Sequence, residues 1–345
     1  MNKIDIVKRA IEFKYPPYMP FELWDVPYIY NAYGTKNPKD VKLIEGTEDF
    51  DSLIVSYNWT LDEIGINDDG EKLKRDEWGI SYRIPNDTNT NYIIMSHPLR
   101  GKNDIVEYKF PNPKVTEKYF EKISMVINER YQGRFISAYI DPGAFIIAAF
   151  LFGYDELFIN LIEKTSLIRD LMIKIFEYHR TIVWYFKQIG AHMITYIDEV
   201  AGTKGMMISP KIFRNVLSPL YKNFFEYIHS LNLYTCCLFD GNISEIVPDI
   251  LLMDTDCVQF MAPNDTGIEN IEKYFKGKRC IKASVDMRNT LATGDENQVI
   301  EEAHKLVHSF NSYKGGFIPI ILRWFRPEYP EKNVLASVKT FRNLR

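Results

Sequence analysis

Residues 193–242 decide the fold: they read MITYIDEVAGTKGMMISPKIFRNVLSPLYKNFFEYIHSLNLYTCCLFDGN. The stretch opens with an apolar run, MITYI, which is typical of a buried strand and ends in two adjacent acids, Asp198 and Glu199. After a glycine-containing turn, Ser209-Pro210 predicts the start of a helix, because serine is a favoured N-cap and proline is tolerated at the first helical position.

The second half of this stretch completes a repeating unit. The predicted amphipathic helix runs to about His229, and a second apolar run, Tyr234–Phe239, ends in Asp240 and the turn residues Gly241 and Asn242. A strand that is apolar on both faces, then a helix, then another such strand indicates a parallel sheet. Such folds keep their chemistry in the polar residues at the carboxyl ends of the strands.

The same unit recurs along the chain. Further predicted strands are Val26–Tyr33, Leu53–Tyr57, Phe135–Ile140, Cys257–Met261, Cys280–Asp286 and Gly316–Ile321. Eight strands alternating with helices predict a closed (β/α)8 barrel, a TIM barrel of the α/β class, with residues 1–345 as a single domain. An open doubly wound sheet would show a glycine-rich phosphate-binding turn after its first strand, and the sequence contains none.

Two segments do not follow this alternation of strands and helices. Residues 1–20 begin with a short amphipathic helix that the pair Pro16-Pro17 ends. Residues 74–110 contain two strand-like runs around a polar turn, which predict an antiparallel hairpin inserted after the second barrel strand. Between the second barrel strand and this hairpin, we expect a short helix from Trp59 to about Ile64.

Composition excludes several classes of function. The formal net charge of -4 leaves no basic surface for nucleic acid or for an anionic membrane. No apolar run approaches the length that spans a bilayer, and the N-terminus lacks a signal-peptide core, so we expect a cytoplasmic protein. The four cysteines, of which Cys236 and Cys237 are adjacent, are typical of reduced thiols.

Polar residues at the predicted strand ends form the candidate site. The candidate catalytic residues are Glu199, Asp198 and Asp240; the candidate substrate-binding residues are Tyr28, Tyr30, Asn31, Tyr33, Asn58, Trp59, Tyr139, Asn242, Asp286, Arg323, Trp324 and Arg326. The same strand-end set includes Asp141 and Arg288. The acids also fit structural roles: Asp198 and Glu199 as a helix cap or loop anchor, and Asp240 as an ordinary turn residue.

The histidines do not indicate a metal site. They are scattered, and none has the His-x3-His or Cys-His spacing that binds metal. We expect His179, His229, His304 and His308 to lie on the solvent faces of helices.

Several short motifs together carry a family resemblance. They are DEWG at 76–79, HPL at 97–99, the Asp198-Glu199 segment running into GTKGMMISP, the turn at 240–242, Asp286 after its strand, and GGFIPI followed by PEKN at 330–333. In order and spacing the chain resembles the uroporphyrinogen decarboxylase (URO-D) superfamily from about residue 20 to the C-terminus. The resemblance implies a (β/α)8 barrel.

Within that superfamily the resemblance favours one branch. True uroporphyrinogen decarboxylases have an arginine-rich signature after the first strand and an aspartate after the second. Here those segments read IYNAYGT and SYNWT, with Ser56 or Asn58 at the aspartate position. The DEWG and HPL hairpin is instead similar to the corrinoid-dependent methyltransferases, which move methyl groups to or from cobalamin carried by a partner corrinoid protein.

The resemblance also bears on zinc. Thiol methyltransferases of that branch hold zinc with a His-x-Cys turn after the fifth strand and a cysteine after the eighth. The corresponding residues here are Leu238, Asp240 and Arg323. We therefore expect no zinc at the family position, and a thiol such as coenzyme M is a poor acceptor. A metal-free site is favoured over the alternative of a different metal held by Glu199, Asp240 and a cysteine.

These observations predict a methyltransferase of the O-demethylase type. It would take a methyl group from a small methylated donor, for example an aryl methyl ether, and pass it to cob(I)alamin on the partner. Glu199 or Asp198 would supply the proton, Arg323 would hold a ring carboxylate, and the aromatic candidates would wall the ring. Two alternatives stay open: a decarboxylase (carboxy-lyase) anchored by Arg323, and a non-catalytic binding barrel.

Overall fold

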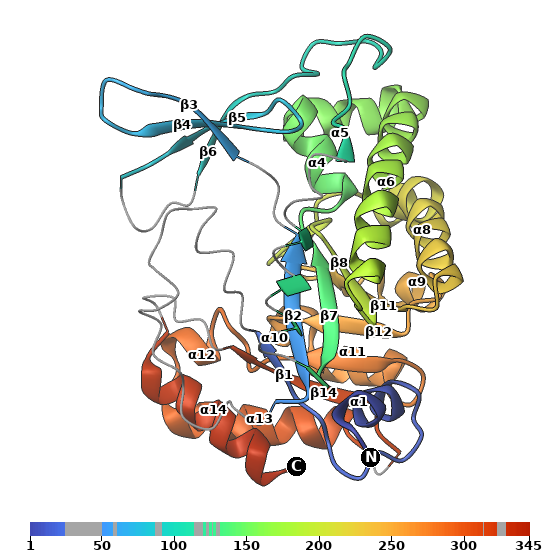
Figure 1. Ribbon diagram of the computed structural model, residues 1–345, viewed down its shortest axis with the longest axis vertical. Helices are drawn as coiled ribbons and strands as arrows, with labels where there is room; N and C mark the ends of the chain where they lie inside the picture. Colours follow the sequence, from blue (N-terminus) through green and yellow to red (C-terminus); the bar gives the residue numbers. More distant parts are fainter. Residues whose placement is uncertain are drawn as a thin grey trace.

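The computed structural model describes residues 1–24, 50–57, 61–86, 92–113, 120–121, 124–125, 127–128, 132–312, 314–322 and 329–345. Eight parallel strands close a barrel in the order β1-β14-β13-β12-β11-β8-β7-β2, which confirms the predicted fold (Figure 1). These strands are β1 Glu22–Trp24, β2 Ser52–Tyr57, β7 Phe135–Ile140, β8 Met193–Asp198, β11 Tyr234–Phe239, β12 Cys257–Phe260, β13 Cys280–Ala283 and β14 Phe317–Leu322. The predicted strand Val26–Tyr33 lies outside the described residues, and the first barrel strand comes just before it.

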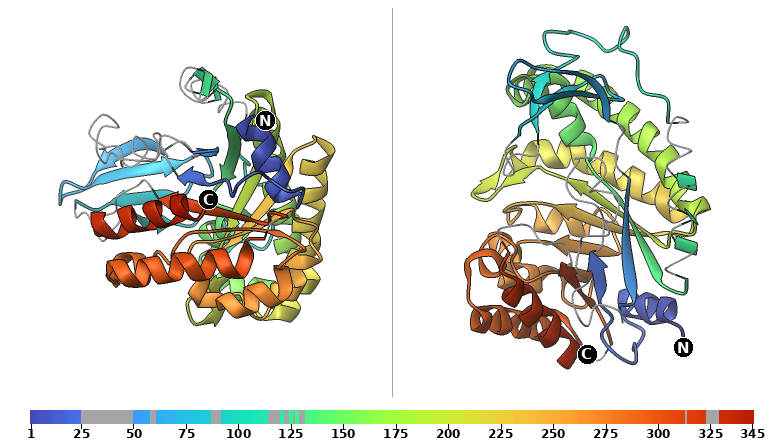
Figure 2. Two further views of the ribbon diagram at one scale, coloured as in Figure 1. Left: turned by 90° about the horizontal axis from the view of Figure 1, so that it is seen from below. Right: turned by 60° about the vertical axis from the view of Figure 1, so that its left-hand side comes forward.

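Helices cover the outside of the barrel (Figures 1 and 2). The longer ones are α1 Lys3–Ile11, α4 Ala144–Phe152, α5 Tyr154–Glu163, α6 Thr165–Gln188, α8 Ser218–Ser230, α9 Val247–Leu251, α11 Ile268–Phe275, α13 Glu296–Phe310 and α14 Glu331–Asn343. The helix start at Ser209 is as predicted: its side chain accepts from the backbone N–H of Ile212, and Pro210 occupies the first turn. From there α7 Pro210–Ile212 and a π-helical turn, Phe213–Leu217, lead into α8.

A buried polar layer lies inside the barrel. The carboxylate of Glu22 on β1 forms an ion pair of 2.6 Å with Lys282 on β13. Glu22 also accepts hydrogen bonds from Ser52 on β2 and from the hydroxyl of Tyr139 on β7. Because Glu22 contacts three other strands, it ties the three-residue strand β1 into the closed barrel.

An apolar cluster lies below this layer. Val7, Ala10 and Ile11 of α1 pack against interior residues that include Met193 and Cys236. Cys237 belongs instead to the larger core outside the barrel, so the two adjacent cysteines point to opposite faces of β11, as the alternation of a strand requires. All four cysteines are free and buried.

The insertion after β2 is larger than the predicted hairpin. It is a four-stranded antiparallel sheet in the order β3-β4-β5-β6. Its strands are β3 Leu61–Ile66, β4 Lys72–Asp76, β5 Ser81–Ile84 and β6 Ile93–Ser96. The predicted hairpin corresponds to β5 and β6. The predicted short helix ending near Ile64 is wrong, because residues 61–66 pair with β4 and satisfy their backbone groups there.

The two insertion motifs attach this sheet to the carboxyl end of the barrel, beside α4 and α5 (Figure 1). In DEWG, Glu77 accepts hydrogen bonds from the hydroxyls of Tyr57 at the end of β2 and Tyr178 on α6. In HPL, His97 Nδ1 lies 2.7 Å from the carbonyl oxygen of Phe150, and the Leu99 N–H donates to Leu151. HPL therefore contacts carbonyl groups at the C-terminal end of α4, which have no partner inside the helix.

No single helix among the described residues is long and apolar enough to cross a membrane. Taken together, α4 and α5 would meet the length and composition of a span, but they are bent by 106° at Gly153. All nine residues of α4 are buried inside the protein.

Candidate functional site

Three carboxylates follow three neighbouring barrel strands. Asp141 comes directly after β7, Glu199 after β8 and Asp240 after β11, and β8 pairs with both of the others. The turn that carries Asp240 is held against the segment after Glu199, because the Asn242 N–H donates to the carbonyl oxygen of Gly202 at 2.8 Å. The fold thus gathers the three acids at the carboxyl end of the barrel.

Asp198, the last residue of β8, has a different environment. It is completely buried and accepts four hydrogen bonds. Two come from the backbone N–H groups of Phe145 and Ile146 at the start of α4, at 2.9 and 3.0 Å. The others come from the Tyr221 hydroxyl at 2.7 Å and the Glu199 N–H at 3.1 Å. This carboxylate therefore caps α4 from a neighbouring strand.

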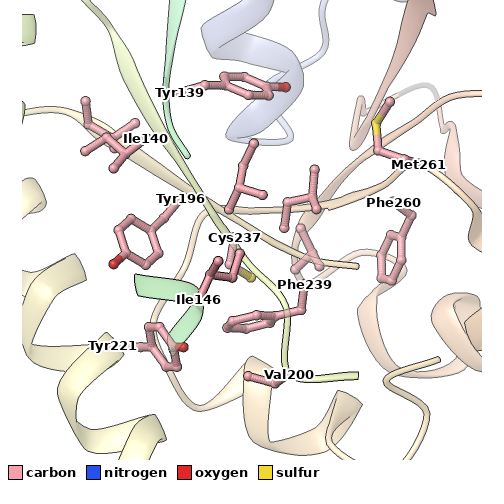
Figure 3. Packing of buried hydrophobic residues seen from close by; sticks show 14 of the residues in the cluster. Tyr139, Ile140, Ile146, Tyr196, Val200, Tyr221, Cys237, Phe239, Phe260 and Met261 are labelled. Atoms are coloured by element: carbon pink, nitrogen blue, oxygen red, sulfur yellow. The ribbon is translucent and has the colours of Figure 1, made fainter. Parts of the chain in front are cut away.

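Tyr196 completes the cap. Its side chain points to the same face of β8 as Asp198, and its hydroxyl accepts the N–H of Ala144 at 2.7 Å. The same hydroxyl lies 2.9 Å from Nδ1 of His179 on α6. Figure 3 shows Tyr196, Ile146 and Tyr221 gathered together, with Tyr139 separated from them. The first three N–H groups of α4 are thus all bound by side chains of β8.

His179 corrects a sequence prediction. It is 2% exposed and does not lie on the solvent face of α6. Burial lowers its pKa to about 3, so the imidazole is neutral at physiological pH, and its Nδ1 shares a hydrogen bond with the Tyr196 hydroxyl. His179 lies on a helix, as predicted, but other parts of the protein cover more of the surface of α6 than its sequence pattern indicates.

Burial and hydrogen bonding act in opposite directions on Asp198. The pKa of Asp198 is raised to about 6. Burial raises it, and the hydrogen bonds from Phe145, Tyr221 and Ile146 oppose part of that rise. At neutral pH the carboxylate is mostly ionised and both oxygens are occupied. Its contacts are those of a structural anchor, and its predicted role as the acid stays a prediction.

Asp141 and Glu199 carry carboxyl groups with no hydrogen bond or ion pair to any other described residue. Burial, and then the charges of Glu199, Asp198 and Asp240, raise the pKa of Asp141 to about 7. Burial, then the charges of Asp240 and Asp198, also raise the pKa of Glu199, and Arg288 opposes that rise. Both side chains keep exposed surface at the mouth, although the surrounding protein removes part of the water around their carboxyl groups. No described residue therefore prevents either carboxyl group from contacting a substrate.

Arg288 is the cation of this cluster. Its guanidinium forms ion pairs with Asp240 and with Asp265, which follows β12. Sequence reasoning placed Arg288 at a strand end but gave it no role. The arginine holds Asp240 at the rim and partly balances the acidic mouth.

The remaining described candidates have clear contacts. Asp286 is buried, and its Oδ1 accepts from the N–H groups of Arg288 and Asn289. Asn242 accepts from the N–H of Ser244 and forms a turn. The Tyr139 hydroxyl lies in the interior layer, where its oxygen is 2.5 Å from Oε1 of Gln259. Asn242 and Asp286 therefore shape loops at the mouth, and Tyr139 lies in the layer beneath it.

Nine predicted substrate-binding residues fall outside the described part of the chain. They are Tyr28, Tyr30, Asn31, Tyr33, Asn58, Trp59, Arg323, Trp324 and Arg326. Their roles stay predictions.

At the zinc position of the family, the described residues are Leu238 and Asp240. Leu238 is buried in the core, and Asp240 is paired with Arg288. Within the described ranges, no group of three or more His, Cys, Asp or Glu side chains has the geometry to hold a metal ion.

The closed parallel barrel with its acidic carboxyl end defines a (β/α)8-barrel protein. The sequence profile described as uroporphyrinogen decarboxylase (URO-D) matches residues 76–344, and the chain belongs to that family. A search of curated proteins found no match. The profile match agrees with the family resemblance carried by the sequence motifs.

Three solved structures are similar to this chain, and the first of them shares its fold. A methyltransferase from Methanosarcina mazei is similar over 99% of both chains, with a TM-score of 0.74 and 15% identity. An endoglucanase from Clostridum cellulovorans covers 99% of this chain and 96% of its own, with a TM-score of 0.49 and 10% identity. A D-psicose 3-epimerase from Clostridium cellulolyticum H10 covers 96% of this chain and 98% of its own, with a TM-score of 0.45 and 10% identity.

Proposed function

We propose that this protein is a corrinoid-dependent methyltransferase. In this proposal it acts in the cytoplasm on a small methylated donor, such as an aryl methyl ether, and passes the methyl group to a partner corrinoid protein. Membership of the URO-D family and the fold shared with the Methanosarcina mazei methyltransferase support this class.

One observation carries the proposal: the carboxyl groups of Glu199 and Asp141, which have no partner among the described residues, follow neighbouring barrel strands and have raised pKa values. When a carbon–oxygen bond of an ether breaks, the leaving oxygen requires a proton. A carboxyl group that keeps its proton near neutral pH can supply it. Aspartate and glutamate side chains with ordinary pKa values would be ionised at neutral pH and would not.

The other residues of the mouth have supporting roles. Asp240 and Arg288 form the rim, and Asp198 fixes the start of α4 beside the mouth. The aromatic side chains predicted from the sequence would contact the ring of the donor, and Arg323 would bind a ring carboxylate. When bound at the mouth, the corrinoid of the partner supplies the nucleophile that accepts the methyl group.

A spectroscopic assay tests this function. Purified protein is mixed with cob(I)alamin and a panel of methoxylated aromatic acids and simple methyl donors, and the visible spectrum reports methylation. We expect transfer from one donor class. Glu199→Gln, which removes a carboxyl group at the mouth, should reduce the rate at least ~10²-fold. Glu226→Gln, on the exposed outer face of α8, is the matched control and should leave the rate unchanged.

Two further readouts separate the alternatives. Release of carbon dioxide from an acid substrate, without methylation, would identify a decarboxylase instead. Stoichiometric zinc in elemental analysis of the active protein would contradict the metal-free reading of residues 238 and 240.

A further inference from the structure

We propose that a hollow beside the mouth is a second binding site, which takes a small polyhydroxy molecule without negative charge, such as a sugar, and thereby restrains the segment that carries Arg288. The hollow has a volume of about 440 Å³ and is lined by residues of α11 and α13 and of the segments that follow β12 and β13. This volume is within the range of small-molecule sites. Binding at the hollow is independent of the methyl transfer proposed above.

Two short segments each place one residue at the mouth and its neighbour at the hollow. In α10 Pro263–Thr266, Asp265 forms the ion pair with Arg288, and Asn264 lines the hollow. In the segment after β13, Arg288 forms that pair, and Asn289 lines the hollow. The ion pair at the mouth and the hollow therefore share one wall, formed by residues 263–266 and 286–290.

Two buried carboxylates orient the amide side chains of this wall. Glu302 of α13 is 8% exposed, and its Oε1 lies 3.2 Å from Nδ2 of Asn264. Asp286 is completely buried, and its Oδ1 lies 3.4 Å from Nδ2 of Asn289. Because a carboxylate oxygen accepts hydrogen bonds, both amides turn their N–H2 groups towards it, and their carbonyl oxygens are left for another partner. The wall thus offers two oriented acceptors to the hydroxyl groups of a ligand.

The other side chains at the hollow are mostly polar. They are the hydroxyls of Thr290 and Thr293, the amide of Gln298, the carboxylate of Glu301 and the ammonium group of Lys305, with Ile268 as an apolar member. Hydroxyl and amide groups both donate and accept hydrogen bonds, as the hydroxyl groups of a sugar or polyol do. This lining therefore matches a polyhydroxy molecule better than an apolar one.

The charges at the hollow select against an anion. Glu301 and Glu302 are both acidic. Lys305 is the cation among the described lining residues, and its Nζ is already 2.6 Å from a carboxylate oxygen of Glu269. A carboxylate or phosphate group on a ligand would be repelled by the two acids. A neutral molecule, or one that carries an ammonium group, would not.

Glu302 connects the hollow with the segment of Arg288. The Oε1 that holds Asn264 also accepts the backbone N–H of Asp286, at 2.9 Å. Oδ1 of Asp286 in turn accepts the backbone N–H groups of Arg288 and Asn289, at 3.0 and 2.9 Å. A ligand bound to Asn264 and Asn289 therefore restrains the backbone that positions Arg288.

Three sugars that differ in charge test the class of ligand. Glucose is neutral, glucosamine is cationic and glucuronate is anionic, and ligand-observed NMR titration of the whole chain measures their dissociation constants. We expect saturable binding of glucose and glucosamine, and binding of glucuronate that is at least ~10-fold weaker. Absence of saturable binding for all three sugars, or tighter binding of glucuronate, would overturn the inference.

A filling variant locates the bound sugar. Thr293 lines the hollow from the exposed end of α12 Thr290–Thr293, so Thr293→Phe places a ring in the hollow and should abolish binding of glucose and glucosamine. Asn297→Phe adds the same ring to an exposed position of α13 outside the lining and should bind both sugars as the wild type does. Retained binding in Thr293→Phe would place the sugar elsewhere, for example at the mouth, and overturn the inference.

A charge variant tests the same site without changing its shape. Glu301→Gln keeps the size of an exposed side chain and removes its charge. It should weaken binding of glucosamine roughly 2–5-fold and leave binding of glucose unchanged. Glu296→Gln, exposed on the same helix and outside the lining, should change neither. Unchanged binding of glucosamine in Glu301→Gln would contradict its binding at the hollow.

Hydrogen exchange tests the connection with the mouth. Restraint of the wall should slow exchange of the amides in residues 286–290 when glucose is saturating. The slowing should be absent in Thr293→Phe and present in Asn297→Phe. Unchanged exchange in a wild-type protein that binds glucose at the hollow would overturn the restraint of Arg288. The titrations and the exchange experiment need no methyl donor, so they report on the hollow whether or not the protein methylates cobalamin.

Discussion

Gly143 and Asp198 are in contact at the carboxyl ends of the neighbouring strands β7 and β8. A Cβ atom at position 143 would lie 2.4 Å from Cγ of Asp198 and 2.5 Å from the carbonyl oxygen of Ile197. Neither neighbour can move freely, because Asp198 is held by four hydrogen bonds and Ile197 belongs to β8. The absence of a side chain at position 143 is therefore what lets β8 cap α4 so closely.

Substitution of this glycine should disrupt the clamp. We expect Gly143→Ala to lower the free energy of unfolding by about 3 kcal/mol, because the new methyl group must displace buried backbone or the Asp198 carboxylate. Chemical denaturation measures the change. Gly202→Ala is the matched control, since a Cβ atom there meets no atom within 4 Å, and it should change stability by less than about 0.5 kcal/mol. A well-tolerated Gly143→Ala would show that α4 can shift away from β8.

The Asp198 carboxylate should contribute more to stability than any one of its partners. Asp198→Asn replaces one acceptor oxygen by an N–H2 group that faces donors, so we expect a loss of about 3 kcal/mol. Tyr221→Phe removes a single hydrogen bond of 2.7 Å and should cost about 2 kcal/mol.

The double variant tests whether the two groups act together. Because Tyr221 and Asp198 are in direct contact, the two losses should not add. Additive losses in denaturation experiments would mean that the Tyr221 hydroxyl acts independently of the carboxylate.

The interior ion pair between Glu22 and Lys282 gives a separate prediction. Both side chains are 1% exposed, so Glu22→Gln leaves the Lys282 ammonium buried without a counter-charge. We expect a loss of about 3–5 kcal/mol in the free energy of unfolding. The combined variant Glu22→Gln with Lys282→Met removes both charges and should recover part of that loss. If the double variant were less stable than either single one, packing of the lysine stem would outweigh its charge.

Much of the barrel could be predicted because its strands are apolar on both faces. The runs that became β8 and β11 differ sharply from the amphipathic helix between them, and that contrast needs no tertiary information. The strand Leu61–Ile66 was missed because LDEIGI alternates weakly and most of its side chains are exposed. Only its pairing with β4 makes it a strand.

The site could be located from the sequence, but the sequence did not show which role each of its acidic residues has. Strand ends indicated Asp198, Glu199 and Asp240 as a group. The position of Asp198 as the last residue of β8 does not reveal that its partners lie 52 and 53 residues earlier, at the start of α4. Asp141 was placed in the strand-end set without a role, since the charges that raise its pKa come from other strands.

Arg288 gives the last prediction, because it links the rim to the acids of the mouth. Its positive charge lowers the pKa of Glu199, against the effects of burial and of Asp240 and Asp198. In Arg288→Ala that opposing charge is absent, so the pKa of Glu199 should rise further. The protonated form of Glu199 should then persist to higher pH, and the alkaline limb of the pH profile of kcat/KM should move upward.

Arg288→Lys is the matched control for this change. A lysine keeps the positive charge, so the pH profile should stay near that of the wild type. It cannot bind Asp240 and Asp265 with one planar guanidinium group, so the free energy of unfolding should fall by up to about 1 kcal/mol. An unchanged profile in Arg288→Ala would place the arginine too far from Glu199 to influence it in solution. An equal upward shift in both variants would mean that the geometry of the fork, and not the charge, sets the protonation of the mouth.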